Sequence, residues 1–136
     1  MTNPILPLKA AIRSKLIADA ALLAVLGGAR VYDETPRGQP FPFVTFGLFT
    51  ASDNSTSSDR GHETKLEIQV WSRDGSTKQA LLIADRIEAL LHDQNLTLTG
   101  QHLVNNHLVD MDTALERDGE TIRITLNFRA VTEVTV

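Results

Sequence analysis

The spacing of apolar residues changes from a strand period to a helix period near the middle of the chain. Apolar residues first occupy every second position, as in a strand with one buried face: Leu66, Ile68 and Val70. An Arg-Asp-Gly turn follows. Beyond it, apolar residues recur three and four positions apart, the period of a helix with one buried face. The pattern predicts a strand over residues 63–72 and a helix from Ser76.

The predicted helix has a start signal and a second set of apolar residues. Ser76 and Gln79 are spaced as a capping box, in which each side chain bonds the backbone of the other. Leu81 and Leu82 lie off the main apolar stripe, beside charged residues. We interpret these two leucines as a second apolar contact, with another subunit as the proposed partner.

The N-terminal third is predicted to be helical and then irregular. Asn3-Pro4 is a helix-start signal, Asp19 is placed to cap a second short turn, and Gly27-Gly28 ends the helical region. Arg30-Val31-Tyr32 is a candidate very short strand. A stiff, non-helical connector follows, built around Pro36, Gly38, Pro40 and Pro42.

Three further strands and two turns complete the pattern. Strands are predicted from Phe43 to Thr50, within residues 100–115, and over residues 120–131. Gly47 indicates either a bulge or a close backbone approach in the first of them, and Arg117-Asp118-Gly119 forms the last hairpin turn. The order helix-strand-strand-helix-strand-strand predicts an α+β fold. Its mostly antiparallel four-stranded sheet should carry two helices on one face.

Composition narrows the class of protein. The 136 residues indicate one domain, residues 1–136, and the absence of cysteine excludes disulfides and thiolate sites. We find neither a signal peptide nor an apolar run long enough to span a membrane, so we expect synthesis in the cytoplasm and no membrane partner. The net charge of −4, with scattered basic residues, argues against stable DNA binding.

No residue cluster indicates catalysis, a cofactor or a metal. The chain has no glycine-rich phosphate loop and no nucleophile elbow. His102 and His107 are five residues apart on a predicted strand and so point to opposite faces. Asp53, Asp59 and Glu63 lack the alternating ligands of a calcium loop. We therefore expect a protein without enzymatic activity.

Two features are candidates for contacts between molecules. Trp71 lies on the polar face of its strand with Glu67 and Gln69. Two interpretations of Trp71 are open. Either the twist of the strand or a neighbouring helix buries it within its own chain, or it contacts another subunit or a tube at an interface. The second feature is a long polar loop, residues 51–61. It is either a mobile surface loop or an assembly arm that orders against a neighbour or lines a pore, through Ser52, Asp53, Asn54, Ser55, Thr56, Ser57, Ser58, Asp59 and Arg60.

The order of short motifs resembles the tail-completion or tail-terminator proteins of long-tailed phages and of phage-like gene transfer particles. The likeness spans nearly the whole chain. It is carried by Leu8 to Leu26, Gly28 to Asp33, Pro40 to Gly47, Val70-Trp71-Ser72-Arg73, Leu103-Val104 and Thr121 to Ala130.

This resemblance implies a structural virion protein of the tail and neck. Such a subunit forms a homo-hexamer, a ring that caps the tail tube protein, ends tail polymerisation and meets a head-side stopper protein. DNA passes through the lumen without being specifically bound. The alternatives are a head-side neck connector or stopper, and less favoured, a small ligand-binding or hydrolase domain. Assembly would take place in the host cytoplasm.

Overall fold

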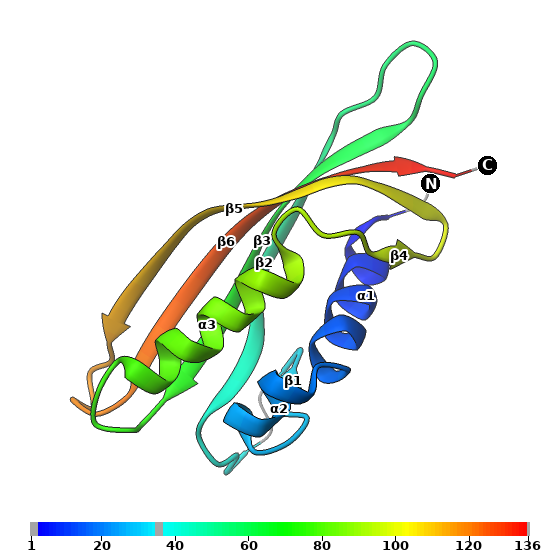
Figure 1. Cartoon of the computed structure of the whole chain (residues 1–136). Coiled ribbons are helices and arrows are strands. Elements are labelled where there is room, and N and C mark those ends of the chain that lie inside the picture. Colours follow the sequence, from blue (N-terminus) through cyan, green and yellow to red (C-terminus); the bar gives the residue numbers. More distant parts are fainter. Residues whose placement is uncertain (1–2, 35–36, 136) are drawn as a thin grey trace.

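The computed structural model describes residues 3–34 and 37–135 (Figure 1). Pro36, part of the predicted connector, lies outside these residues. None of the described helices has the length and apolar character needed to cross a membrane. The helices are α1 (Ile5–Ile17), α2 (Ala20–Leu26) and α3 (Lys78–Leu91). The strands are β1 (Val31–Tyr32), β2 (Phe43–Asp53), β3 (Gly61–Ser72), β4 (Thr97–Leu98), β5 (Gln101–Leu115) and β6 (Ile122–Val134).

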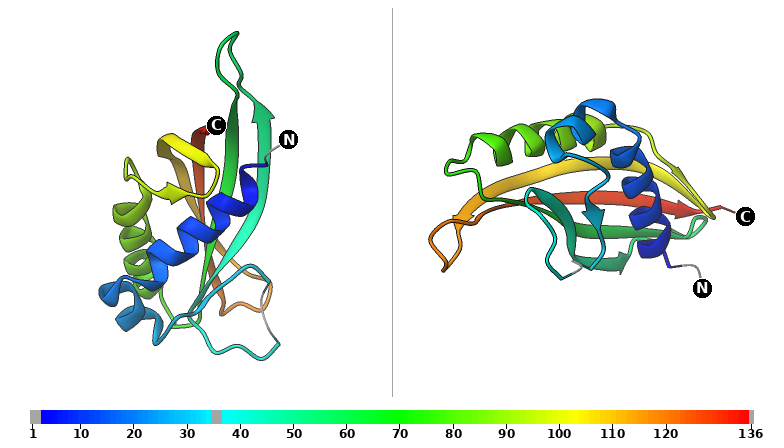
Figure 2. Two further views of the ribbon diagram at one scale, coloured as in Figure 1. Left: turned by 90° about the vertical axis from the view of Figure 1, so that its right-hand side faces the viewer. Right: turned by 90° about the horizontal axis from the view of Figure 1, so that it is seen from below.

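The strands form one curled sheet in the order β1-β2-β3-β6-β5-β4. Every pair is antiparallel except β1 with β2. All three described helices lie on one face of the sheet (Figure 2). The α+β class and the mostly antiparallel sheet are therefore confirmed, whereas the predicted two helices and four strands are wrong. The first helical region divides at Asp19, and the short strands β1 and β4 extend the two sides of the sheet.

The core lies between the helices and the inner face of the two central strands. β3 pairs with β6 without interruption from Gly61 opposite Glu133 to Ser72 opposite Ile122. The predicted alternation is confirmed, because the inward side chains are at most 2% exposed: Leu66, Ile68, Val70, Ile124, Leu126, Phe128 and Ala130. Burying each large apolar side chain stabilises the fold by about 1.5–3 kcal/mol, so this ladder is the centre of the fold.

The hairpin between β2 and β3 is longer than predicted and extends beyond the body of the protein (Figure 1). Ser52 and Asp53, assigned to the loop from sequence, belong to β2 and pair with Glu63 and His62. The connection is therefore residues 54–60. Strand pairing continues because β6 supports β3 as far as Gly61, so the backbone ladder persists where the side chains become polar.

The predicted irregularity at Gly47 is confirmed as a bulge between Phe46 and Phe49. A side chain at Gly47 would place its Cβ 2.9 Å from the Cβ of Glu67 and 2.7 Å from its Oε1. The Leu48 N–H, freed from regular pairing, donates to the same Glu67 oxygen at 3.2 Å. Glycine therefore lets the two strands approach, and Glu67 satisfies the bulged backbone.

The division of the first helical region depends on one carboxylate. Asp19 caps α2 as predicted, accepting the Leu22 N–H at 2.9 Å. Its oxygens also accept two hydrogen bonds from Arg86 of α3, at 2.6 and 2.7 Å. This bidentate pair, helped by the Leu22 hydrogen bond, lowers the Asp19 pKa from 3.8 to about 2. Asp19 thus joins the short α2 helix to the main helix of the fold.

The predicted capping box at the start of α3 is wrong. The Gln79 side chain turns instead to Ser72, whose hydroxyl donates to Gln79 Oε1 at 2.6 Å. Ser72 is fully buried at the end of β3, so its hydroxyl needs a partner inside the protein. Ser76 still contributes at the helix start, where its Oγ accepts the Lys78 N–H at 3.3 Å.

We predict that the Asp19–Arg86 pair makes folding pH-dependent in acid. Because folding lowers the Asp19 pKa from 3.8 to about 2, its contribution is complete above about pH 5 and is lost as the pH falls from about 4 towards 2. Asp19→Asn keeps a cap acceptor but removes the charge. Since Arg86 is 42% exposed and screened by water, we expect a cost of about 1 kcal/mol at pH 7.

Urea denaturation at pH 7 and at about pH 3 measures this difference. Asp19→Ala, which removes the cap as well, should cost about 2 kcal/mol at pH 7. Equal losses of stability in acid for the wild-type protein and for Asp19→Asn would contradict the assignment.

We predict that Gly47→Ala destabilises the protein by about 1–3 kcal/mol, because the added methyl group meets a cross-strand Cβ that cannot swing away. Leu48→Ala is the matched control, since Leu48 is 68% exposed and should leave the melting temperature nearly unchanged. Equal melting temperatures for Gly47→Ala and the wild-type protein would show that the bulge does not need glycine.

Candidate functional site

The five predicted interface residues lie on two different surfaces. Glu67, Gln69 and Trp71 point from β3 to the outer face of the sheet, the face away from the helices. Leu81 and Leu82 belong to α3, on the helical side (Figure 2). The structure therefore does not bring the two groups together, and any contacts that they make involve different neighbours or different sides of one neighbour.

Trp71 is half-buried by residues of its own chain. Its ring stacks on Phe43 of β2, with centroids 6.1 Å apart, and the Arg123 guanidinium lies 5.7 Å from its centroid. The indole N–H donates to the Thr45 hydroxyl at 2.9 Å. Aromatic and cation-π contacts thus hold the ring in a defined orientation, with part of its surface still open to a partner.

Arg73, which ends the Val70-Trp71-Ser72-Arg73 run, fastens one end of the outer face. Its Nε lies 2.7 Å from Thr121 Oγ1, its second amino nitrogen lies 3.1 Å from Asp118 Oδ2, and its guanidinium covers the Phe41 ring at 4.3 Å. Arg73 therefore ties the connector before β2 to the β5–β6 turn. The four residues of the Val70-Trp71-Ser72-Arg73 run thus have four different roles. Val70 is in the core and Trp71 on the outer face. Ser72 bonds α3, and Arg73 bonds the β5–β6 turn.

Asp118 organises the β5–β6 turn from within, as the predicted Asp-Gly signal implied. It accepts the N–H groups of Glu120 and Thr121 and the Thr121 hydroxyl at 2.6–2.9 Å. These bonds, with Arg73 as a smaller contribution, hold the Asp118 pKa well below its usual value. Gly119 has a φ of +75°, the left-handed conformation that glycine adopts without strain.

Glu67 and Gln69 have internal roles. Glu67 accepts the bulge N–H of Leu48, as described above. The Gln69 carbonyl accepts the Thr45 hydroxyl at 3.4 Å. Both side chains are half-buried. Their place on the outer face is thus explained in part by the fold, and Trp71 has the largest apolar surface of the three.

Leu81 and Leu82 differ in exposure. Leu81 is half-buried and packs against the core, whereas Leu82 is 50% exposed. Although Leu81 lies off the main apolar stripe, its side chain therefore packs within its own subunit. Leu82 alone keeps the apolar surface that a second contact requires.

Residues 54–60 form a turn held by its own polar groups. The Asp53 carboxylate accepts the Ser55 hydroxyl at 2.6 Å and its N–H at 3.2 Å, which lowers the Asp53 pKa. The Thr56 N–H donates to the Asp59 carbonyl at 2.8 Å. Glu63 pairs instead with Arg129 at 2.8 Å. The Asp59 carboxylate accepts the Ser58 hydroxyl at 3.4 Å. The carboxylates of Asp53, Asp59 and Glu63 thus have separate partners.

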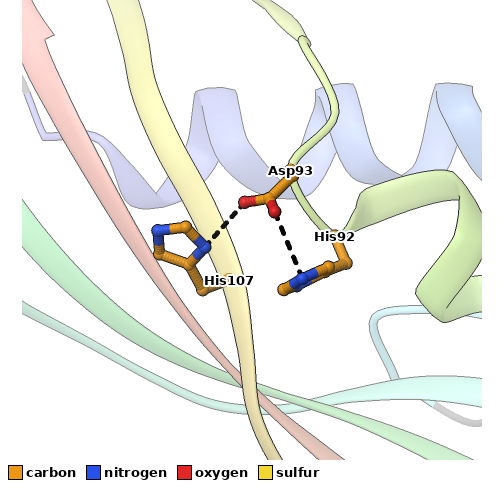
Figure 3. Close-up of side chains that lie close together, drawn as sticks. All are labelled: His92, Asp93 and His107. Carbon is orange, nitrogen blue, oxygen red and sulfur yellow. Dashed lines mark ion pairs between the residues drawn. The ribbon is translucent and has the colours of Figure 1, made fainter.

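His92, Asp93 and His107 form a cluster that sequence analysis missed (Figure 3). Their nearest ligand atoms lie within 4.8 Å of one another. The Asp93 carboxylate is 2.7 Å from His107 Nδ1 and 3.3 Å from His92 Nε2. His92 caps the end of α3, and His107 lies on β5. The signal was weak because the histidines belong to different elements and only the fold brings them together.

The backbone amide of Leu108 determines the chemistry of this cluster. It donates to His92 Nδ1 at 2.9 Å, so a neutral His92 ring carries its proton on Nε2 and donates to Asp93. A metal ion on Nε2 would move that proton to Nδ1, opposite the Leu108 N–H, and break this hydrogen bond. With the Asp93 N–H bonded to the Asn106 carbonyl at 2.8 Å, the cluster fits best as a polar joint between α3 and β5.

Comparison with known proteins identifies a matching family and similar solved structures. The family described as tail completion protein gp17 matches residues 10–133. A chain of the virion of a native gene transfer agent particle superposes with a TM-score of 0.90 at 27% identity, over 98% of this chain and 99% of that chain. A search of curated proteins found no match. Since the family match spans nearly all of the chain, this protein belongs to the tail completion protein gp17 family, a structural component of the virion tail.

Proposed function

We propose that this protein is the subunit of a hexameric ring that caps the tail tube, ends tail polymerisation and joins the tail to the head. The observation that carries the proposal is the match to the tail completion family together with the near-complete likeness to a gene transfer agent virion chain. In this proposal the partners are five further copies, the tail tube protein and a head-side neck protein.

The surface chemistry supports a structural role. Among the described residues, the outer sheet face carries polar and aromatic side chains held by hydrogen bonds and ring contacts, and the one metal-compatible group is the His92 joint. A head-to-tail ring uses two different patches on each subunit. Trp71 on the outer face and Leu82 on α3 lie on different surfaces, as such an arrangement requires.

The charge of the chain supports passage of DNA through the ring without tight binding. DNA-binding proteins obtain most of their affinity from clustered basic residues that replace counterions. Here the net charge is −4, and three of the basic residues named above are already paired with acids: Arg73 with Asp118, Arg86 with Asp19 and Arg129 with Glu63. A ring of such subunits would not hold DNA in its lumen.

Loss of the protein distinguishes tail completion from a head-side stopper. We predict that particles without it have overlong or headless tails, whereas loss of a stopper gives heads that leak DNA. Electron micrographs of the mutant particles, with purified protein added back, measure both phenotypes. Normal tails with leaking heads would overturn the proposal in favour of the stopper.

We predict that the β2–β3 hairpin acts in assembly. Replacing residues 55–60 by Asn-Gly keeps the strand register and should leave the melting temperature within a few degrees of wild type, because these side chains are exposed. Ring formation on tail tubes should fall several-fold.

A length-matched variant with Gly and Ser at residues 55–60 is the control. Loss of assembly in the short variant alone would show that the reach of the hairpin matters, and loss in both would assign the role to its side chains. Normal tail length and head attachment in both variants would make the hairpin only a spacer.

A further inference from the structure

Both sides of the sheet contain a strand segment whose outward backbone has no partner in the described residues. β1 pairs with β2 only at Val44 and Thr45, so the edge of β2 is unpaired over residues 46–53. β4 pairs with β5 only at Gln101 and His102. The residues after α3 bond Asn106 and Leu108, which leaves the β5 edge unpaired over residues 109–115.

The hydrogen-bond pattern shows which residues point outward. The Asn54 N–H donates to Gly61 and the Glu116 N–H to Thr121, both into the sheet. Because the direction alternates along a strand, the outward residues of β2 are Phe49, Ala51 and Asp53, and those of β5 are Met111, Thr113 and Leu115. Each edge therefore presents three residues with free N–H and C=O groups, a template for another strand.

Apolar side chains are concentrated on these two edge strands. The described residues include six large hydrophobic side chains that are exposed, and four of them lie on β2 or β5. They are Leu48 at 68%, Val104 at 47%, Val109 at 61% and Leu115 at 62%. A solvated edge usually carries charge to prevent association, so apolar side chains here indicate that the edges are covered in the assembled state.

We infer that the β2 edge of one subunit pairs with the β5 edge of the next, and that this strand pairing is one of the contacts between neighbours in the ring. This inference rests on the proposed ring and names its interface. β2 and β5 run in opposite directions because three antiparallel pairings separate them. Copies arranged head to tail therefore bring β5 beside β2 in an antiparallel sense.

A register with Ala51 opposite Thr113 satisfies the side chains. Directly paired residues share a face, and both of these residues lie on the inner side, since Ala51 pairs with Thr64 and Thr113 with Ile124. The same register sets Phe49 beside Leu115 and Ser52 beside Asp112. It places neither Asp53 nor Asp112 directly opposite another acid.

The position of the two edges within the sheet fits a closed cylinder. Within one subunit, the pairing across β6 and β3 sets Thr113 of β5 at the same level as Val44 of β2. Val44 and Ala51 are seven residues apart, and the bulge accounts for one of them, so Ala51 lies six strand positions from that level. This offset is about 20 Å, at roughly 3.3 Å per residue, across four strands that are together about 19 Å wide. Each neighbour must therefore be shifted along the strand direction by about as much as one subunit's sheet is wide. This shift corresponds to strands tilted by about 45° from the ring axis, close to the 35–45° strand tilt of closed sheets.

Because the natural chain contains no cysteine, crosslinking provides a clean test. The variants are Ala51→Cys, Thr113→Cys and the double variant, oxidised on tail tubes or treated with a short bismaleimide that tolerates a shift of register. The double variant should give a ladder of covalent multimers ending at the closed ring. Each single variant should remain monomeric on a denaturing gel.

The possible results separate the inference from the proposed function. Covalent dimers from a single variant would show like edges pairing with each other and would overturn the inference. Rings seen by microscopy without crosslinks in the double variant would overturn the interface and leave the ring intact. Absence of rings on tubes for the wild-type protein would overturn both. Ala89→Cys with Ser14→Cys, exposed residues on the helices α3 and α1 and not on either edge strand, controls for random collision.

Proline substitution tests the backbone bonds directly. Thr113→Pro removes an outward N–H, so the subunit should keep its melting temperature within a few degrees while ring formation falls at least several-fold. Asp112→Pro removes an N–H directed at β6 and should instead destabilise the subunit. Unchanged ring formation by Thr113→Pro would overturn the strand pairing.

Discussion

The uninterrupted ladder between β3 and β6 is the constraint on which the rest of the structure depends. It places twelve residues of β3 in continuous register with β6, and both strands turn apolar side chains to the same helices. A shift by one residue would turn that apolar set outward, so the burial of Leu66, Ile68 and Val70 fixes the pairing of the whole sheet. The outer strands β2 and β5 each follow this ladder and adjust to it by bulges.

Features with a strong local signal were predicted, and features decided by distant partners were not. The alternation in β3 and β6, the Asp19 cap and the Asp-Gly turn depend on neighbouring residues and are confirmed. The predicted capping box does not form, because Gln79 instead accepts the hydroxyl of Ser72, seven residues earlier. Ser72 is buried, so leaving its hydroxyl without a hydrogen bond would cost free energy. The end of the hairpin loop was misplaced because β6 extends the pairing of β3 into a polar stretch.

The candidate surfaces show the same division. Sequence alternation placed Trp71 on the outer face but could not reveal that Phe43 stacks on it or that Thr45 accepts its N–H. Leu81 and Leu82 had the same sequence signal, yet only Leu82 stays exposed, because Leu81 packs against the core. The His92 cluster combines a helix end with a strand, and no spacing rule within one element could find it.

The bulges explain how a subunit can keep two unpaired edges without aggregating. β2 carries one, between Phe46 and Phe49, and β5 carries two, between Leu103 and Asn105 and between Leu108 and Asp110. A bulge twists its strand and reverses which residues point outward, so a flat strand cannot simply extend the edge. A partner strand can bond the unpaired N–H and C=O groups beyond each bulge only if it is shifted along the edge by the matching distance. Another copy presents such an edge at a fixed offset, so the same irregularity disfavours random association and favours a neighbour in a ring.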